Sequence, residues 1–157
     1  MKILGVDPGS RITGYGFLLH KDKKLHYLAS GCIKPPSKDP FIDRLHHIYT
    51  SLTKIIIEYS PDALALEDIF VAKDPKSAIK LGQVRGAIMI AAKNCGVDVI
   101  EYPPTKIKLA LVGNGHAEKK QVSKMVELIL NIKGIKSPDE SDALAVAICH
   151  GNTMRYS

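Results

Sequence analysis

The chain has 157 residues, a length typical of one domain with a single hydrophobic core, and we treat residues 1–157 as one domain. Its 22 lysine and arginine residues exceed its 16 aspartate and glutamate residues, and the resulting net charge of +6 favours a polyanionic partner over an acidic small molecule. Cys32, Cys95 and Cys149 lack zinc-site spacing and no apolar stretch is long enough to span a membrane, so we expect a soluble cytoplasmic protein with buried free thiols.

The first predicted element is a short apolar strand over residues 3–6 that ends at Asp7. A run without polar residues is typical of a strand buried on both faces. Pro8 and Gly9 then turn the chain and leave Asp7 at the strand end. An ionised carboxylate there needs a cation, a helix N-terminus or a metal ion beside it. Asp-Pro-Gly is also a common turn composition, and these residues alone favour that simpler interpretation.

Two further strands are predicted over residues 15–19 and 25–33, joined by a charged turn. Together with the first strand they form an antiparallel meander. A helix is then predicted to begin with Asp39 as its N-cap and Pro40 as its first residue. Apolar residues at helical spacing continue this helix to Tyr59.

A second short apolar strand, over residues 63–66, ends at Glu67 and repeats the pattern of the first strand. The helix before it makes a crossover connection, which favours a parallel and right-handed arrangement. Asp7 and Glu67 are therefore expected at the same end of adjacent strands. In open α/β sheets the carboxyl ends of the strands are where ligands bind.

The next helix is predicted to begin with Asp74 as N-cap and Pro75 as first residue, and to end at Gly96. Packing against the sheet is one explanation for its many small residues. The helix has more apolar faces than one sheet can cover, however, so we favour a dimer interface. The small residues are Ala78, Gly82, Gly86, Ala87, Ala91 and Ala92.

The last part of the chain is predicted to hold a fifth strand over residues 97–102, a short segment over 105–112 and a helix over 117–131. Ser137 and Glu140 form a capping-box pattern that begins the final helix. The predicted fold is therefore an α/β sheet of five strands flanked by helices.

Two acids, Asp139 and Asp142, lie three residues apart at the start of the final helix and share one of its faces. Acids in a first turn often serve only to complement the helix dipole. Asp142, however, directly precedes an apolar run over residues 143–149. An acid at the start of a buried helix needs a counter-charge.

Acids thus stand at the ends of elements that share one core, namely Asp7, Glu67, Asp139 and Asp142. Clustered carboxylates cannot all ionise without cations beside them. Hard divalent ions meet this need, and Mg²⁺ prefers a few carboxylates together with water and phosphate oxygens. Two ions roughly 3.5–4 Å apart would activate a water and stabilise the leaving oxygen of an in-line phosphoryl transfer.

The chain resembles the bacterial RuvC family of crossover junction endodeoxyribonucleases in five stretches that follow in order to about His150: residues 5–16, 65–70, 77–86, 112–119 and 139–145. The resemblance implies a ribonuclease H-like α/β fold, with a mixed five-stranded sheet (antiparallel meander plus parallel strands) flanked by helices. It also implies a homodimer that resolves four-way (Holliday) DNA junctions in homologous recombination and DNA repair by paired, symmetric nicks. The family's usual partners are a junction-recognition protein and a branch-migration ATPase.

The same likeness implies roles for single residues. The catalytic and metal-binding acids are Asp7, Glu67, Asp139 and Asp142, which would hold two Mg²⁺ ions, with Mn²⁺ as a possible substitute. Lys108 and Lys119 match lysines that attend the junction and the scissile phosphate, and Phe70 matches an aromatic that stacks on bases. Without the likeness we would interpret Phe70 as a core residue. Further DNA contacts are predicted for the basic residues in or beside the matched stretches, namely Lys73, Lys76, Lys80, Arg85 and Lys106.

The chain departs from the family pattern at Asp74, where asparagine is more usual, and at Val84, which replaces a small residue. The extra negative charge makes a DNA contact at Asp74 doubtful. Because no serine, cysteine or histidine is paired as a nucleophile, we expect attack by metal-activated water, leaving 5′-phosphate and 3′-hydroxyl ends. Two alternatives are a phosphate-cradling ATPase of the actin and sugar-kinase type and a junction-binding module without catalytic activity.

Overall fold

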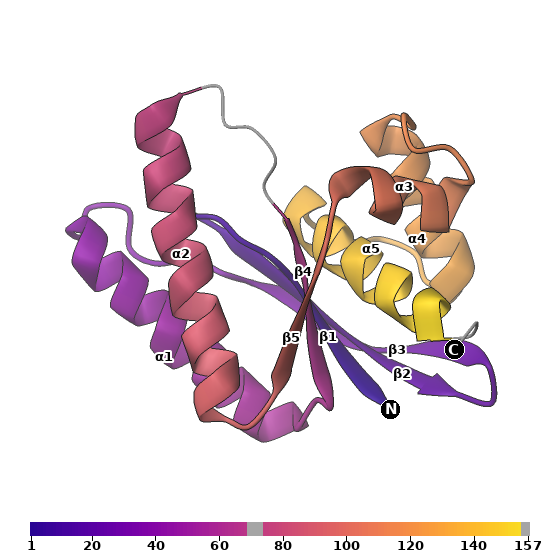
Figure 1. Ribbon diagram of the computed structural model, residues 1–157, viewed down its shortest axis with the longest axis horizontal. Coiled ribbons are helices and arrows are strands. Elements are labelled where there is room, and N and C mark those ends of the chain that lie inside the picture. The colour runs from indigo at the N-terminus through magenta and orange to yellow at the C-terminus, as the bar shows by residue number, and fades with distance from the viewer. Residues whose placement is uncertain (69–73, 155–157) are drawn as a thin grey trace.

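The computed structural model describes residues 1–68 and 74–154, and it shows one five-stranded sheet with helices on both faces (Figure 1). The strands are β1 (Lys2–Asp7), β2 (Thr13–Lys21), β3 (Lys24–Ile33), β4 (Ala63–Glu67) and β5 (Asp98–Tyr102). The helices are α1 (Phe41–Tyr59), α2 (Pro75–Asn94), α3 (Pro104–Val112), α4 (Lys119–Leu130) and α5 (Pro138–Thr153).

The strand order is β3-β2-β1-β4-β5. The pairs β1–β2 and β2–β3 are antiparallel, whereas β1–β4 and β4–β5 are parallel. This is the predicted meander followed by crossover connections, so the predicted fold class is confirmed. In the parallel pair Val6 lies opposite Leu66, which places the following residues, Asp7 and Glu67, at neighbouring strand ends.

Side chains alternate between two hydrophobic clusters, one on each face of the sheet. In β1, Ile3 packs in the cluster with α3, α4 and α5, while Leu4 and Val6 pack in the cluster with α1 and α2. Asp7 has the same parity as Ile3, and by the same alternation Glu67 follows Ala65. Both acids therefore belong to the face of the sheet that α5 covers (Figure 1).

Helix α5 lies unusually close to the sheet because glycines face it. A Cβ atom on Gly5 of β1 would lie 2.0 Å from the carbonyl oxygen of Ala143, and one on Gly14 of β2 would lie 2.1 Å from that of Asp139. Only residues without a side chain allow this approach. The start of α5 is thereby held against the strand that carries Asp7.

Two predicted helix starts differ from the structure. Helix α1 begins at Phe41, and its N-cap residue is Pro40, which has no side chain that could accept a capping hydrogen bond. The predicted cap at Asp39 is therefore wrong. The N–H of Asp39 instead donates to the carbonyl oxygen of Pro36 and closes a turn. At α5, Ser137 is the N-cap as predicted, but Glu140 accepts a hydrogen bond from Ser30 of β3 rather than completing a capping box.

The reciprocal capping box is found at α4, where Glu118 and Gln121 bond to each other's backbone. Asp74 caps α2 as predicted, accepting from the N–H groups of Lys76 and Ser77. The three cysteines are free thiols, but only Cys149 is fully buried, because Cys32 and Cys95 are partly exposed. No helix in the described ranges combines the length and apolar character needed to cross a bilayer.

Candidate active site

A pocket of about 230 Å³ lies where β1 and β4 end beside the start of α5. It is lined by all of the predicted acids together with two of the predicted lysines: Asp7, Glu67, Asp139, Asp142, Lys108 and Lys119. The parallel register of β1 and β4 supplies the first two acids. The close contact of α5 with the sheet supplies the other two, and the lysines come from α3 and α4.

The acids of the pocket repel one another in a partly buried environment. The pKa of Asp7 is raised from 3.8 to about 7. Burial is the largest cause of this shift, and repulsion from the carboxylates of Asp142, Asp139 and Glu67 also contributes to it. The pKa of Glu67 is raised as well, mainly by burial and secondly by repulsion from Asp142. Fully ionised, this cluster is costly, and nearby cations lower the cost.

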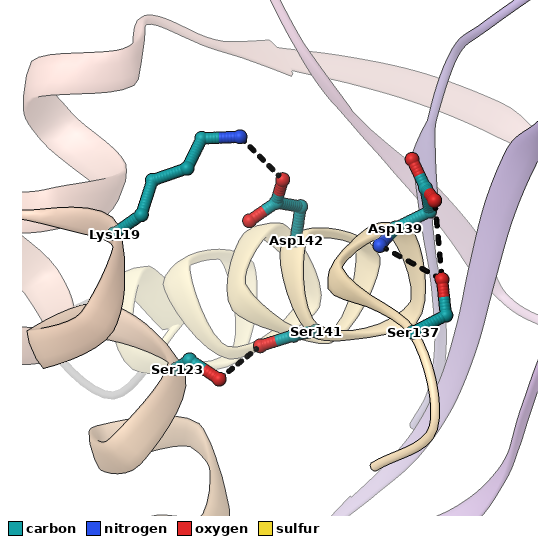
Figure 2. A network of polar contacts seen from close by, with 6 residues as sticks. All are labelled: Lys119, Ser123, Ser137, Asp139, Ser141 and Asp142. Carbon is teal, nitrogen blue, oxygen red and sulfur yellow. Dashed lines mark hydrogen bonds and ion pairs between the residues drawn. The ribbon is translucent and has the colours of Figure 1, made fainter.

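Lys119 supplies one such cation. Its Nζ atom lies 3.1 Å from Oδ2 of Asp142 (Figure 2), and this contact raises the pKa of the Lys119 ammonium. The lysine side chain is 83% exposed and the Asp142 side chain 27% exposed, so Lys119 reaches into the pocket from solvent. An ion pair of this kind contributes little to stability, and the lysine is therefore free to exchange Asp142 for another anion.

Hydroxyl groups fix the start of α5 (Figure 2). The Ser137 hydroxyl accepts from the backbone N–H of Asp139 and donates to its Oδ2 atom, both at 3.1 Å. The hydroxyls of Ser141 and Ser123 lie 3.2 Å apart and link α5 to α4. These contacts hold Asp139 in place and keep the helix that carries Lys119 beside it.

Arg85 of α2 was predicted to contact DNA, but it is only 7% exposed and does not line the pocket. Its guanidinium donates to the carbonyl oxygen of Glu67 and to the carboxylate of Glu101, and it lies 3.6 Å from Asp68. The structure thus gives Arg85 an internal contact that supports the end of β4. Its place on the apolar stripe with Ile88 could have indicated burial.

Three other predicted DNA contacts, all among the described residues, lie outside the pocket. Lys106 places its Nζ atom 5.0 Å from the centre of the Tyr102 ring, and Lys80 lies 5.7 Å from the centre of the Phe41 ring. Lys76 is exposed in the first turn of α2. Phe70 and Lys73 lie outside the described residues.

The pocket offers donors that suit a hard divalent cation. Within residues 1–68 and 74–154, no three His, Cys, Asp or Glu side chains lie close enough together to hold a metal ion as they stand. The acids lining the pocket nevertheless present only oxygen donors, and both burial and the other three acids raise the pKa of Asp7. This oxygen-rich, charge-crowded set fits Mg²⁺ in ligand type.

The fold and the acid-lined pocket together define the class of protein, a nuclease with a ribonuclease H-like fold. The family model described as "Crossover junction endodeoxyribonuclease RuvC" matches residues 3–150. The RuvC protein of Pseudoalteromonas atlantica is 50% identical over 96% of this chain and 87% of its own, and that of Geobacter metallireducens is 48% identical over 98% and 93%. The solved structure of Thermus thermophilus RuvC in complex with Holliday junction substrate is 33% identical, with a TM-score of 0.92 over 99% of this chain and 96% of that one. The chain belongs to the RuvC family.

Proposed function

We propose that this chain is a structure-selective DNA endonuclease that resolves four-way (Holliday) junctions by paired, symmetric nicks during recombination and repair. The observation that carries the proposal is the convergence of four acids and two lysines on one pocket. Its membership of the RuvC family and its similarity to a RuvC protein solved with a Holliday junction support the choice of substrate.

In the proposed reaction the chain holds the metals and positions the phosphate. Asp7, Glu67, Asp139 and Asp142 would hold two Mg²⁺ ions, or Mn²⁺ in their place. When bound, the ions supply an activated water and neutralise the charge that develops on the leaving oxygen. Lys108 and Lys119 line the same pocket and would attract the scissile phosphate. Hydrolysis of its bond to the 3′ oxygen would leave 5′-phosphate and 3′-hydroxyl ends.

The proposed enzyme is a homodimer, because a junction presents two equivalent strands about a two-fold centre. The outer surface of α2 supports this choice. Ile79 and Ile90 are 64% and 56% exposed. Between them, a Cβ atom on Gly82 or Gly86 would meet no atom of another described element within 4 Å. An exposed stripe of apolar and small residues is suited to close helix packing.

The same proposal includes the cellular context. We infer that the enzyme works in the bacterial cytoplasm, where free thiols such as Cys32 and Cys95 remain reduced. A junction-recognition protein and a branch-migration ATPase would prepare its substrate. A pull-down with each of these two proteins, with and without junction DNA, tests this part.

A denaturing gel of end-labelled DNA tests the activity. A four-way junction and a linear duplex of the same sequence are incubated with the protein in Mg²⁺ or in chelator. We expect position-specific nicks in the junction alone, lost with chelator and with Asp7→Asn. Binding without nicking by the unaltered protein would instead favour a non-catalytic junction-binding module, and normal nicking by Asp7→Asn would contradict the site assignment.

A further inference from the structure

A second and larger hollow, of about 800 Å³, lies on the face of the sheet covered by α1 and α2. It is bounded by the turn after β1, the segment after β3 and both helices. We call it the basic groove because its lining includes four cations, and none of the described residues that line it is acidic. The cations are Arg11, Lys34, Arg44 and Lys80.

Phe41 at the start of α1 holds two of these cations beside each other. The guanidinium of Arg44 lies 5.4 Å from the centre of the Phe41 ring, and the ammonium of Lys80 lies 5.7 Å from it. Arg44 also donates to the carbonyl oxygen of Ser10 at 3.3 Å, while its buried Nε has no hydrogen-bond partner in the described part of the chain. Protein contacts therefore position Arg44 without using all of its donors.

The groove has a fixed position relative to the active site. Both adjoin the turn between Asp7 and Thr13. Thr13 is fully buried, and its hydroxyl donates to the carbonyl oxygen of Gly9 at 2.8 Å and accepts from the N–H of Gly9 at 3.3 Å. This clamp closes the backbone of residues 9–13, the segment that carries Arg11.

The charge of the groove comes from side chains and not from a helix end. The N–H groups at the start of α2 are already bonded to Asp74, whose carboxylate also accepts from the Ser77 hydroxyl at 2.9 Å. Asp74 is thus engaged by its own helix. Arginine, lysine and serine side chains are the usual ligands of phosphodiester oxygens. Four cations spread over one broad groove suit several successive phosphates better than one small anion.

We propose that the basic groove binds the phosphodiester backbone of a duplex arm of the junction, next to the strand that enters the active site. This inference rests on the proposed junction-cleaving function and adds a second contact surface to it. DNA that places one phosphate in the acidic pocket meets the groove on the other side of the turn that joins them. The groove would fix the direction of the arm and carry no base information.

Binding measurements in an Asp7→Asn background test the proposal, because the labelled junction then stays uncut. The groove variant is Lys34→Gln with Lys80→Gln. Its matched control is Lys21→Gln with Lys24→Gln, which removes the same charge from exposed lysines in the turn at the opposite end of β1. Fluorescence anisotropy with a four-way junction at increasing salt gives the affinity and the slope of log K against log salt.

We expect the groove variant to bind several-fold more weakly and to lose about one unit of slope per lysine removed. The control should keep the parent's slope. Equal slopes for groove variant and control would overturn the proposal and would favour an acidic protein as the ligand of the groove. If the Asp7→Asn parent itself fails to bind junctions, the proposed function fails first, so the two failures are distinguishable.

Discussion

At the scale of single residues, Asp7 links stability to pH. Its pKa is raised from 3.8 to about 7 in the folded protein, so the folded chain binds more protons than the unfolded chain between these two values. The free energy of unfolding therefore falls as the pH rises through this window. Above about pH 7 the ionised carboxylate destabilises the fold by an amount on the order of a few kcal/mol.

We expect Asp7→Asn to remove this pH dependence. In the absence of divalent ions, the variant should gain about 1–3 kcal/mol of stability near pH 8 and little near pH 5. Urea denaturation at both pH values measures the difference. Asp98→Asn is the matched control, because Asp98 is 79% exposed and pairs with Lys93. Equal responses of the two variants would contradict a raised pKa at Asp7.

Lys119 gives a second prediction at this scale. Lys119→Ala removes the cation beside Asp142 and should reduce nicking of the junction by roughly ten- to a hundredfold and lower the salt slope of binding by about one unit. We expect the same direction for Lys108→Ala, since Lys108 lines the same pocket. Lys120→Ala is the control, because this lysine is exposed and does not line the pocket. Loss of activity in all three variants would indicate a general charge effect.

At the scale of elements, Arg85 joins α2 to the ends of β4 and β5. The sequence indicates a helix and a basic residue in a matched stretch, and this pattern predicts a DNA contact. The structure instead buries it against Glu101 and the backbone of Glu67. A partner from a different strand cannot be inferred from helical spacing, although the apolar stripe around Arg85 could have indicated that it faces inward.

Arg85→Met should therefore act through stability. Arg85 is buried, whereas the Glu101 side chain is 38% exposed, so water can replace the donor that Glu101 loses. The Glu67 carbonyl loses its donor as well, and we expect the free energy of unfolding to fall by about 1–3 kcal/mol. A double-mutant cycle with Glu101→Gln, followed by urea denaturation, measures the coupling between the two residues. An unchanged salt slope of junction binding is expected. If the salt slope of junction binding falls by one unit while stability is preserved, the result would instead support a DNA contact at Arg85.

The acids were predictable because each stands at the end of an element with a clear apolar pattern. Asp7 and Glu67 follow buried strands, and a crossover between these strands already implies a parallel pair. Asp139 and Asp142 begin a helix whose body is apolar. The basic groove could not be predicted in this way, because Arg11, Lys34, Arg44 and Lys80 come from four separate segments that only the folded chain brings together.

Side-chain partners between elements were also beyond the sequence. Glu140 fits a capping-box spacing with Ser137, yet it bonds to Ser30, because β3 lies beside the start of α5 in the folded sheet. Local spacing records which residues could meet along the helix. It holds no information on competing partners from distant strands, and a better placed hydroxyl wins when the fold supplies one.

At the scale of the whole molecule, the number of nicks depends on the number of active sites that engage one junction. A monomer has one acidic pocket and cuts one strand, whereas a two-fold dimer presents two pockets to two equivalent strands. The exposed stripe of α2, defined by Ile79, Gly82, Gly86 and Ile90, is the surface proposed for pairing. A variant with this stripe disrupted should therefore still nick single strands of the junction but should no longer make the paired nicks that resolve it.

Ile79→Glu tests this expectation, since a charge in a packed helix interface is costly. We expect the variant to be monomeric by light scattering and to convert a cruciform plasmid into nicked circles. The linear product should fall roughly tenfold or more, which corresponds to a loss of at least about 1.4 kcal/mol in the free energy of dimer formation. Leu128→Glu on α4 is the control, because Leu128 is 73% exposed and lies on a different helix. A dimeric Ile79→Glu that still yields linear plasmid would move the interface away from α2, and a monomeric Leu128→Glu would move it toward α4.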